Sequence, residues 1–430
     1  MQPDFSSVPR RKFLRQSGLA AAGLAIYGGL RTKGAATSPN ETMRVAVMGL
    51  NRGLDHVNAL IGIKNVEVAM LCDIDDLRLA RALKVMDERQ ARKPQSNKDI
   101  RKVLDDSSLD ALFIAAPNHW HAPAAIMACN AGKHVYVEKP CSHNPWENEM
   151  IVAAARKHKR VVQMGNQRRS WPGEIEAMQM LRSGMIGKLK FARCWYNNSR
   201  PSIGRGKHVP VPSNLDYSLW QGPAPERPYV DNLIHYNWHW RWHWGNAELG
   251  NNGIHALDVA RWGLGVDYPK TVTCNGGRYE FDDDQETPDT TIATYDFGSV
   301  GIMWDGSSCH PRTHEKLPFV TFYGDQGSME TDGGGYKIFD LKGFQTGGGK
   351  GDGGDRVHIE NFLDSVRNGK TPNSEIAEGA KSTLLIHLGN IAYRTGRMLN
   401  VDASSGRLVD DKEGQAFWKR DYRKGWEPKV

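Results

Sequence analysis

Cysteine is scarce in this chain, and its few copies are not arranged in metal-binding or redox pairs. Six cysteines are spread over 430 residues, and no two of them form a C-x-x-C pair. A disulfide-dense scaffold is therefore excluded, and zinc-ribbon and thioredoxin-like sites lose support. Apolar runs long enough to cross a bilayer are also missing beyond the N-terminal stretch. We expect no stable membrane span once that stretch is removed.

The chain also lacks a strong excess of one charge outside its N-terminus. Lys and Arg number 56 and Asp and Glu number 49, which gives a formal net charge of +7. Residues 1–36 hold six of these cations and one of the anions, so about +2 remains for the rest. No basic patch with interleaved aromatic residues is left, and nucleic acid is not an expected partner.

The N-terminal residues are typical of an export signal. The letters RRKFLR begin at Arg10, and a mildly apolar stretch rich in Ala, Gly and Leu follows over 19–30. This pattern resembles a twin-arginine signal, with a basic amphipathic tail or an inner-membrane anchor as the alternative. We expect a signal peptide at 1–36 and a periplasmic protein. Because this route carries folded proteins, it also hints at a cofactor bound before export.

Apolar runs alternate with helical patterns over the next part of the chain. The runs lie at 43–49, 66–73, 111–117, 134–137 and 161–164. Such alternation predicts an α/β domain with a doubly wound parallel sheet of the Rossmann type. We place this domain at 37–165.

Beyond residue 165 the apolar residues follow a period of two. Turn signals separate these runs, which lie at 190–196, 271–279, 290–297, 300–305 and 319–323. They predict an α+β domain at 166–430, with a large, mostly antiparallel open sheet and C-terminal helices. The glycine-rich residues 347–354 are expected to form a loop.

The turn after the first predicted strand lacks the full G-x-G-x-x-G pattern. Residues 49–53 read GLNRG, with Asn51 where the second Gly would fall. Gly49 and Gly53 could still form a turn that brings a pyrophosphate to a helix N-terminus, although a purely structural turn is nearly as well supported. Asp73 ends the second strand, where an acid binds both ribose hydroxyls and repels a 2′-phosphate. Together these features favour NAD over NADP.

Two further strand ends carry polar residues. Pro117, Asn118 and His121 follow the third strand, and Glu138 and Lys139 follow the fourth. Ligands of doubly wound sheets sit at the carboxyl ends of the strands. His121 could equally be an ordinary loop histidine. A lysine buried beside a nicotinamide could orient a substrate hydroxyl and ease its deprotonation.

Several segments in one order carry a resemblance to a known family. The segments VAVMG, CDID, AAPNHWH, GKHVYVEKP, GNQRR and GNNGIHALD lie within about residues 43–400. This combination resembles the Gfo/Idh/MocA family of glucose–fructose oxidoreductase and inositol dehydrogenase relatives. The resemblance implies NAD(P) chemistry on sugars or cyclitols, and an open sheet that often forms oligomer contacts. A homo-oligomer is therefore expected.

The resemblance also assigns roles to single residues. Lys139 matches the family's catalytic lysine, and Pro140 matches a proline that is typically cis. His255 matches the catalytic histidine, a plausible general base if its pKa lies near 7. Asn251 stands where many members carry Asp and cannot take a proton. Proton transfer would then rest on His255 with Lys139, unless His255 merely packs on its helix.

An aromatic cluster precedes this motif. Residues 235–244 read HYNWHWRWHW, and in an extended segment their four indoles would share one face. Flat rings stack on sugar C–H faces, so a saccharide-lined wall is one interpretation and core or oligomer packing is the other. Histidines at 235, 239 and 243 would align on a helix as metal ligands, but no carboxylate completes that site. We predict no metal.

The leading hypothesis is a periplasmic NAD-dependent oxidoreductase that moves a hydride between a sugar or glycoside and a tightly held nicotinamide. A redox-neutral, NAD-assisted glycoside-cleaving enzyme is the alternative, and a non-catalytic saccharide-binding protein is a third. The predicted cofactor-binding residues are Gly49, Leu50, Asn51, Arg52, Gly53, Asp73, Pro117, Asn118, His121, Glu138, Lys139 and Gln167. The predicted substrate-binding residues are Arg168, Tyr236, Trp238, Trp244, Asn251 and His255, and the predicted catalytic residues are Lys139 and His255.

Overall fold

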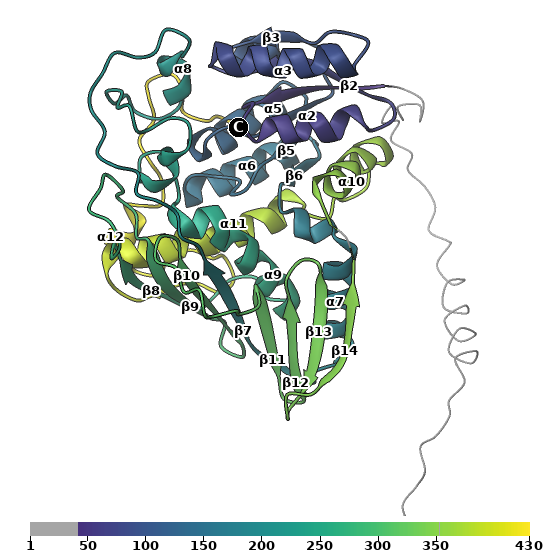
Figure 1. The fold of residues 1–430 in the computed structure, drawn as a ribbon, viewed down its shortest axis with the longest axis vertical. Coiled ribbons are helices and arrows are strands. Elements are labelled where there is room, and N and C mark those ends of the chain that lie inside the picture. The colour runs from purple at the N-terminus through teal and green to yellow at the C-terminus, as the bar shows by residue number, and fades with distance from the viewer. Residues whose placement is uncertain (1–41, 352) are drawn as a thin grey trace, which may run out of the picture. The chain divides into compact units, whose positions relative to one another are not determined.

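The first part of the chain forms a six-stranded, all-parallel sheet with strand order β3-β2-β1-β4-β5-β6 (Figure 1). A computed structural model describes residues 42–351 and 353–430, so the expected signal at 1–36 lies outside the described residues. The strand order is that of a doubly wound dinucleotide-binding sheet. The strands are β1 Met43–Met48, β2 Val66–Cys72, β3 Gln95–Asn97, β4 Ala111–Ile114, β5 His134–Val137 and β6 Val162–Met164.

Helices cover both faces of this sheet because its strands are apolar on both sides. In β1, Val45 and Val47 join the core on one face, while Ala46 and Met48 join the core on the other. The helices of this part are α2 Gly53–Ile61, α3 Asp76–Arg89, α4 Ile100–Leu104, α5 Asn118–Asn130 and α6 Pro145–Lys157. Apolar side chains that are buried on both faces are expected of a parallel sheet covered by helices.

The second sheet has nine strands in the order β14-β13-β12-β11-β7-β10-β9-β8-β15, and β7 with β10 is its one parallel pair. The predicted fold class is therefore confirmed. The strands are β7 Leu189–Asn197, β8 Thr271–Gly277, β9 Thr290–Asp296, β10 Gly301–Ser307, β11 Val320–Gly324, β12 Gly327–Thr331, β13 Gly335–Asp340, β14 Gln345–Lys350 and β15 Leu399–Asn400.

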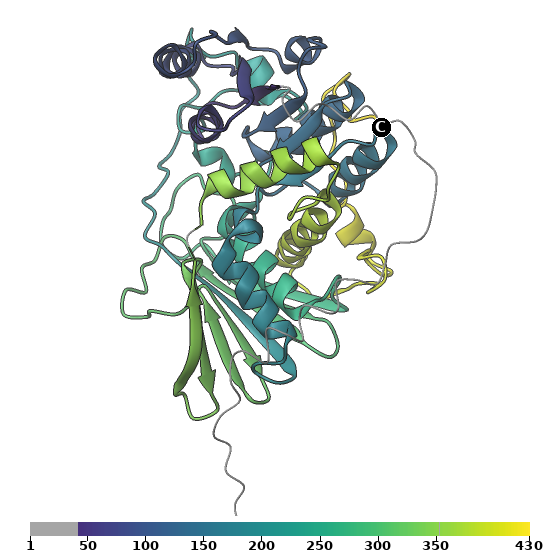
Figure 2. The same cartoon turned by 90° about the vertical axis from the view of Figure 1, so that its right-hand side faces the viewer.

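Helices join the two sheets. α11 Ile376–Thr395 packs on β8 and on α6, so it lies between the second sheet and the first (Figure 1). α10 Asp355–Asn368 returns to the parallel sheet (Figure 2). There Phe362 packs on Phe113 and Tyr136. The other helices of this part are α7 Pro172–Arg182, α8 Tyr217–Gln221, α9 Ile254–Leu264 and α12 Lys412–Gln415. Within residues 42–351 and 353–430, no helix combines the length and apolarity that crossing a bilayer requires.

The glycine-rich segment corrects one expectation. Residues 345–350 form β14, which pairs antiparallel with β13, although 347–354 was expected to be a loop. Glycines carry no side chains that could show a period of two, and here the pairing rests on backbone hydrogen bonds. β12 and β13 were likewise not predicted.

Candidate cofactor and active site

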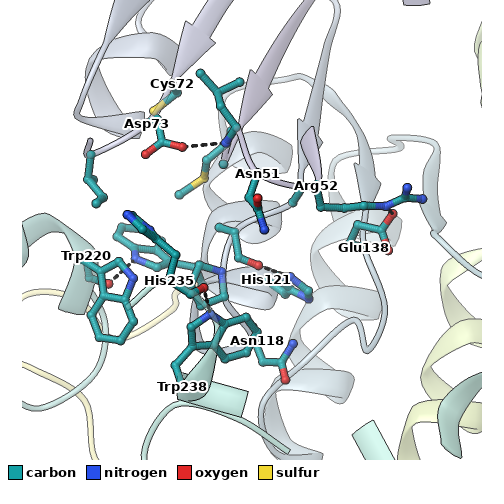
Figure 3. A pocket seen from close by; sticks show the side chains of 18 of the residues that line it. Asn51, Arg52, Cys72, Asp73, Asn118, His121, Glu138, Trp220, His235 and Trp238 are labelled. Carbon is teal, nitrogen blue, oxygen red and sulfur yellow. Dashed lines mark hydrogen bonds and ion pairs between the residues drawn. The ribbon is translucent and has the colours of Figure 1, made fainter. Parts of the chain in front are cut away.

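A cavity of about 500 Å³ opens at the carboxyl ends of the parallel strands (Figure 3). Its walls come from residues at the ends of four strands: 49–52 after β1, 72–74 at the end of β2, 115–118 after β4 and 138–139 after β5. Gln167 and His255 complete it, together with residues of the aromatic segment. Most of the predicted cofactor residues are therefore brought together, and Gly53 begins α2 directly behind them.

The β1–α2 turn is tight at Gly49. Its φ is +84°, and a Cβ added there would lie 2.6 Å from the backbone oxygen of Ala115. The Gly53 N–H donates to the Gly49 oxygen at 3.0 Å. Glycine at 49 thus permits both the left-handed turn and the close approach of the β4 end. The shortened motif still forms a backbone cradle at a helix N-terminus, which fits a pyrophosphate.

Asp73 fixes the neighbouring end of the cavity. Its Oδ2 accepts the Leu50 N–H at 2.6 Å, and its Oδ1 accepts the Asp75 N–H at 3.0 Å. Burial raises the pKa of Asp73, and these two hydrogen bonds oppose the rise. The carboxylate links the β1 turn to the end of β2 and borders the cavity, as a ribose-binding acid must.

Glu138 is the centre of a buried polar group at the end of β5. Its Oε1 accepts from His56 Nε2 at 2.9 Å and from Arg52 Nε and Gln167 Nε2 at 3.2 Å each. Burial alone would raise the pKa of Glu138, but the His56 hydrogen bond and the Arg52 charge hold it well below its usual range. The carboxylate therefore stays ionised and holds Arg52, which Figure 3 shows beside it.

Lys139 points to the second domain. The Lys139–Pro140 peptide is cis, as expected, and Lys139 Nζ donates to the backbone oxygen of Asn251 at 2.7 Å. This oxygen belongs to η3 Leu249–Gly253, a π-helical turn directly before α9. π turns inside helices are frequent at functional sites. Burial lowers the pKa of Lys139, while Glu138 and Glu248 oppose the change.

His255 lines the cavity, but its basicity differs from the expectation. Burial lowers its pKa from 6.5 to about 3, and the charges of Lys139 and Arg168 add to this effect. The expected pKa near 7 is therefore wrong. The imidazole is neutral at pH 7 and a weak base.

His121 is not a loop histidine, because it lies within α5 and is 2% exposed. Its two ring nitrogens lie 2.6 Å from the backbone oxygens of Pro140 and Ala116. The imidazole therefore connects the ends of β4 and β5. Pro117 and Asn118 begin the same helix and line the cavity.

The aromatic segment does not form an extended wall. Residues Asn237–Trp240 form the 3-10 helix η2, and the four indoles do not share one face. Trp238 and Trp244 join one buried cluster, whereas Trp240 contacts Arg200 and Trp242 contacts Arg394. Trp238 and Tyr236 line the cavity, whereas Trp244 is buried 4.7 Å from the ring of Trp220. The expectation of a shared face is wrong because turns replace the period of two.

The histidines of this segment also separate. His235 Nε2 lies 2.9 Å from Asp75 Oδ2, His239 Nδ1 lies 2.6 Å from the Tyr236 oxygen, and His243 Nε2 lies 2.8 Å from the Pro225 oxygen. Each ring thus has its own partner, and they do not share one point as metal ligands would.

Three of the predicted substrate residues lie outside the cavity lining. Trp244 is core, as described above. Arg168 pairs with Glu174 at 3.1 Å and stacks on Phe319. Asn251 contributes its backbone oxygen to Lys139, while its side-chain amide faces Glu248 at 3.5 Å.

Residues 213–240, here called the strap, form a wall that the sequence did not reveal. The Asp216 N–H donates to the Ile74 oxygen at 2.9 Å, and Asn214 Nδ2 donates to Asp75 Oδ1 at 2.7 Å. Leu219, Trp220 and His235 of the strap line the cavity together with Arg78 and Lys98. Figure 3 shows Trp220 and His235 on this wall. A signal was present in the many aromatic residues of 217–244, but it did not specify which strand end they would meet.

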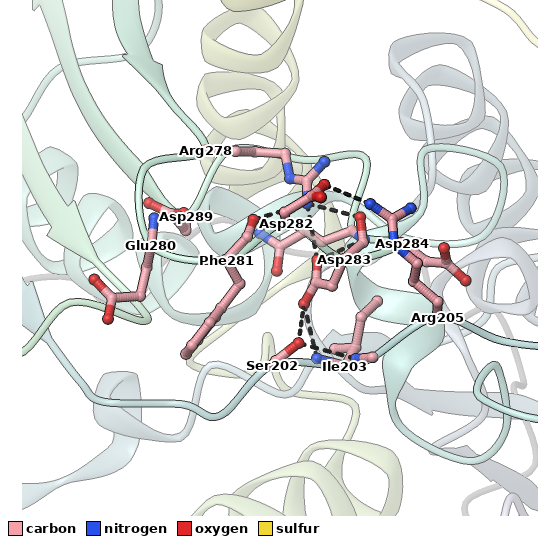
Figure 4. A network of polar contacts seen from close by, with 12 residues as sticks. Ser202, Ile203, Arg205, Arg278, Glu280, Phe281, Asp282, Asp283, Asp284 and Asp289 are labelled. Carbon is pink, nitrogen blue, oxygen red and sulfur yellow. Dashed lines mark hydrogen bonds and ion pairs between the residues drawn. The ribbon is translucent and has the colours of Figure 1, made fainter.

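An acidic turn anchors the end of this wall (Figure 4). Asp284 Oδ2 accepts from the Gly206 N–H at 2.7 Å, from Asn232 Nδ2 at 3.1 Å and from Arg241 Nη2 at 3.2 Å. Asp283 accepts from Ser202 and Arg278. These contacts hold the loop around 200–206 and the aromatic segment against the same turn.

We predict that Asp284→Asn lowers stability in a pH-dependent way. Hydrogen bonds from Gly206, Asn232 and Arg241 outweigh burial and lower the pKa of Asp284 in the folded chain. A lowered pKa stabilises the fold above the unfolded value, and this contribution is lost as the pH falls through the folded value. At pH 7 the cost should be about 1 kcal/mol, or roughly 2 °C in Tm.

Thermal unfolding from pH 7 to pH 3 checks this prediction. The Tm difference between wild type and Asp284→Asn should narrow below about pH 4. Asp282→Asn is the matched control, since the Asp282 side chain is 92% exposed and pairs with Arg205 at the surface. A Tm difference that stays constant over this range would contradict the role given to the Asp284 charge.

Comparison with known families matches nearly the whole described chain. Residues 43–166 match the GFO_IDH_MocA model, described as an oxidoreductase family, NAD-binding Rossmann fold. Residues 201–428 match the GFO_IDH_MocA_C2 model, described as an oxidoreductase family, C-terminal alpha/beta domain. The two matched segments contain the parallel sheet and most of the second sheet, respectively.

Individual relatives are more distant. The chain is 27% identical to an inositol 2-dehydrogenase of Salmonella typhimurium over 234 residues, 54% of this chain and 57% of that protein. It is 27% identical to a glycosyl hydrolase family 109 protein of Shewanella pealeana over 207 residues, 44% of this chain and 45% of that protein. The chain thus spans about half the length of the curated relatives it matches.

A solved structure shares the fold over most of the chain. The aldose-aldose oxidoreductase of Caulobacter crescentus, solved in complex with glycerol, superposes with a TM-score of 0.65. The match covers 84% of this chain and all of that chain at 17% identity. At this identity the similarity concerns the fold.

Proposed function

Because the chain belongs to the Gfo/Idh/MocA family of NAD-binding oxidoreductases, we propose that it transfers a hydride between a sugar or glycoside carbon and a tightly held NAD. The observation that carries this proposal is the meeting of Lys139 and His255 at the end of the cavity that begins with the Gly49 cradle and Asp73. Export to the periplasm by the twin-arginine route and a homo-oligomer are parts of the same proposal.

The residues of the cavity fit a dinucleotide. The Gly49 turn and the first turn of α2 suit the pyrophosphate, and Asp73 suits the ribose hydroxyls. Asn118, Glu138 and Gln167 would border the nicotinamide half. When bound, the nicotinamide supplies the acceptor for a hydride.

The protein's own contribution is to position the substrate and move a proton. In the oxidation direction, neutral Lys139 takes the proton of a ring hydroxyl while the carbon that bears it gives up a hydride, and this carbon becomes a carbonyl. The lowered pKa of Lys139 increases the neutral fraction near pH 7. His255, itself neutral, holds the hydroxyl oxygen through a hydrogen bond.

A substrate screen of the protein purified with its bound nucleotide tests this function. Reducing sugars, cyclitols and glycosides are added singly, and the nicotinamide absorbance is followed. The proposal expects bound NAD to become reduced with at least one of these compounds. It fails if the nucleotide is present and none of these compounds reduces it.

A second candidate function is redox-neutral cleavage of a glycoside, favoured by the similarity to glycosyl hydrolase family 109 proteins. Here a transient carbonyl would acidify a neighbouring C–H, the aglycone would leave, water would add, and the hydride would return. A chromogenic glycoside distinguishes the two functions. Release of the chromophore without added NAD, with no net reduction of the nucleotide, supports cleavage, and its absence supports simple dehydrogenation.

We predict that His235→Ala loosens the held nucleotide. The His235–Asp75 contact ties the strap to the end of β2 over the Asp73 end of the cavity. Loss of a hydrogen bond to a charged group should speed NAD dissociation about 10-fold. To measure this rate, the NAD-loaded protein is diluted into excess NADH, and the replacement of NAD by NADH is followed by fluorescence. His314→Ala, a change in an exposed residue outside the strap, is the control, and equal rates in both variants would contradict the prediction.

A further inference from the structure

A buried carboxyl group lies behind the Lys139 contact and has no part in the mechanism so far. Glu248 is 3% exposed and directly precedes the π turn Leu249–Gly253. Its Oε1 accepts from Asn252 Nδ2 at 2.5 Å, and Asn251 Nδ2 lies 3.5 Å away. A buried carboxyl group with two amide partners is costly unless its charge is used or compensated.

The charges around Glu248 come from several elements. Burial raises the pKa of Glu248, and the charges of Lys139 and Arg200 and the hydrogen bond from Asn252 oppose the rise. Its charge acts in turn on three groups: Lys139, Tyr196 and Cys309.

The π turn connects this carboxyl group to the catalytic lysine. Asn252 is held by Glu248, and the preceding residue offers the backbone oxygen that accepts from Lys139 Nζ at 2.7 Å. Residue 251 itself is an asparagine and brings no charge. At the start of this turn, Glu248 is thus the residue that supplies a negative charge acting on Lys139.

We propose that Glu248 is a positioning residue for Lys139, fixing the turn that binds its amine and supplying the negative charge that Asn251 does not. This rests on the proposed function, because Lys139 is its proton acceptor. The class of substrate follows as well: a neutral hydroxyl compound fits beside a lysine whose charge is already partnered, whereas an anionic substrate would compete with Glu248.

Glu248→Gln keeps the shape of the side chain and removes its charge. The proposal expects the pKa of Lys139 to fall by roughly half a pH unit or more, because the negative charge that stabilises its protonated form has been removed. The rate at which acetic anhydride acylates Lys139, followed by peptide mass spectrometry across pH, measures this without any turnover. The charges of Glu138 and Arg52 also act on this pKa. The Lys139 charge acts in turn on His239 and His255.

Turnover provides the second readout. With a substrate from the screen, kcat of Glu248→Gln should fall on the order of 10- to 100-fold through misplacement of Lys139. The pH at which kcat/KM rises should move down together with the pKa of Lys139. The wild type could prove inactive while Glu248→Gln still shows the expected fall in the pKa of Lys139. That result would count against the proposed function and not against the role of Glu248.

Two further variants keep the test decisive. Glu147→Gln removes a fully buried carboxyl group that pairs with Tyr422 and the His143 N–H, away from the cavity. It should leave the pKa of Lys139 unchanged. The double variant Glu248→Gln/Asn252→Asp keeps one carboxylate in the contact between residues 248 and 252. It should bring the pKa of Lys139 most of the way back to the wild-type value. The proposal is overturned if Glu248→Gln leaves the pKa of Lys139 unchanged, or if Glu147→Gln shifts it equally.

Discussion

Replacement of Lys139 by Met should reduce hydride transfer by about 10²- to 10⁴-fold, the range that a general base contributes. Met keeps the length of the side chain and loses the amine that takes the hydroxyl proton. The nucleotide should remain bound, since its cradle is built from the β1 turn and Asp73. Single-turnover reduction of the bound nucleotide by a substrate from the screen measures the effect, and a chromatographic assay of the released nucleotide shows that loading is intact.

Lys133→Met is the matched control for this change. Lys133 is 5% exposed and lies just before β5, at the sheet edge away from the cavity. Its Nζ donates to the backbone oxygens of Asp106 and Leu109 at 2.7 and 2.8 Å. Its loss should lower stability and leave the rate within about twofold. A Lys139→Met variant that stays within about threefold of wild type would show that another group takes the proton.

The second large effect is expected from Gly49→Ala. The new Cβ would meet the Ala115 oxygen at 2.6 Å, and residue 49 would still need a φ of +84°. The left-handed backbone costs about 1–2 kcal/mol for an alanine, and the clash adds on the order of 1–3 kcal/mol. The chain should unfold at a clearly lower temperature and emerge from purification with little nucleotide.

Gly132→Ala separates the two costs. Gly132 has a φ of +75°, with nothing within 4 Å of an added Cβ. It should show the backbone cost alone and keep its nucleotide. Calorimetry and the nucleotide content of both variants provide the comparison. If Gly49→Ala is no worse than Gly132→Ala, the turn does not need its close approach to the end of β4.

The sequence permitted the architecture to be predicted because apolar runs alternate with helical patterns in the first part of the chain and apolar residues follow a period of two in the second. β5 was placed at its bounds, and Asp73 and Lys139 were placed at the correct strand ends. These positions follow from chain order, since every parallel strand ends at the same edge of the sheet. That edge is where the structure places the cavity.

What the sequence could not reveal depends on contacts between distant segments. The strap meets the end of β2 through His235 and Asp75, which are 160 residues apart. The low basicity of His255 comes from burial beside two cations, and burial is a property of the folded chain. The four tryptophans alternate in sequence, yet the turn at η2 sends Trp244 into the core.

Glu248 shows the same limit at closer range. It lies two residues before the segment GNNGIHALD, and an ordinary helical period would not by itself link it to Lys139. The π turn changes the spacing and directs a backbone oxygen toward Lys139. A single inserted residue in a helix leaves no period that sequence analysis could detect.

The nucleotide content of the protein purified without added cofactor tests the central claim most directly. The protein is denatured, and NAD and NADP are separated and quantified by chromatography. The account predicts about one NAD per chain, held by the Gly49 cradle, Asp73 and the strap. A chain that releases no nucleotide, and that binds none when NAD is added, would contradict it.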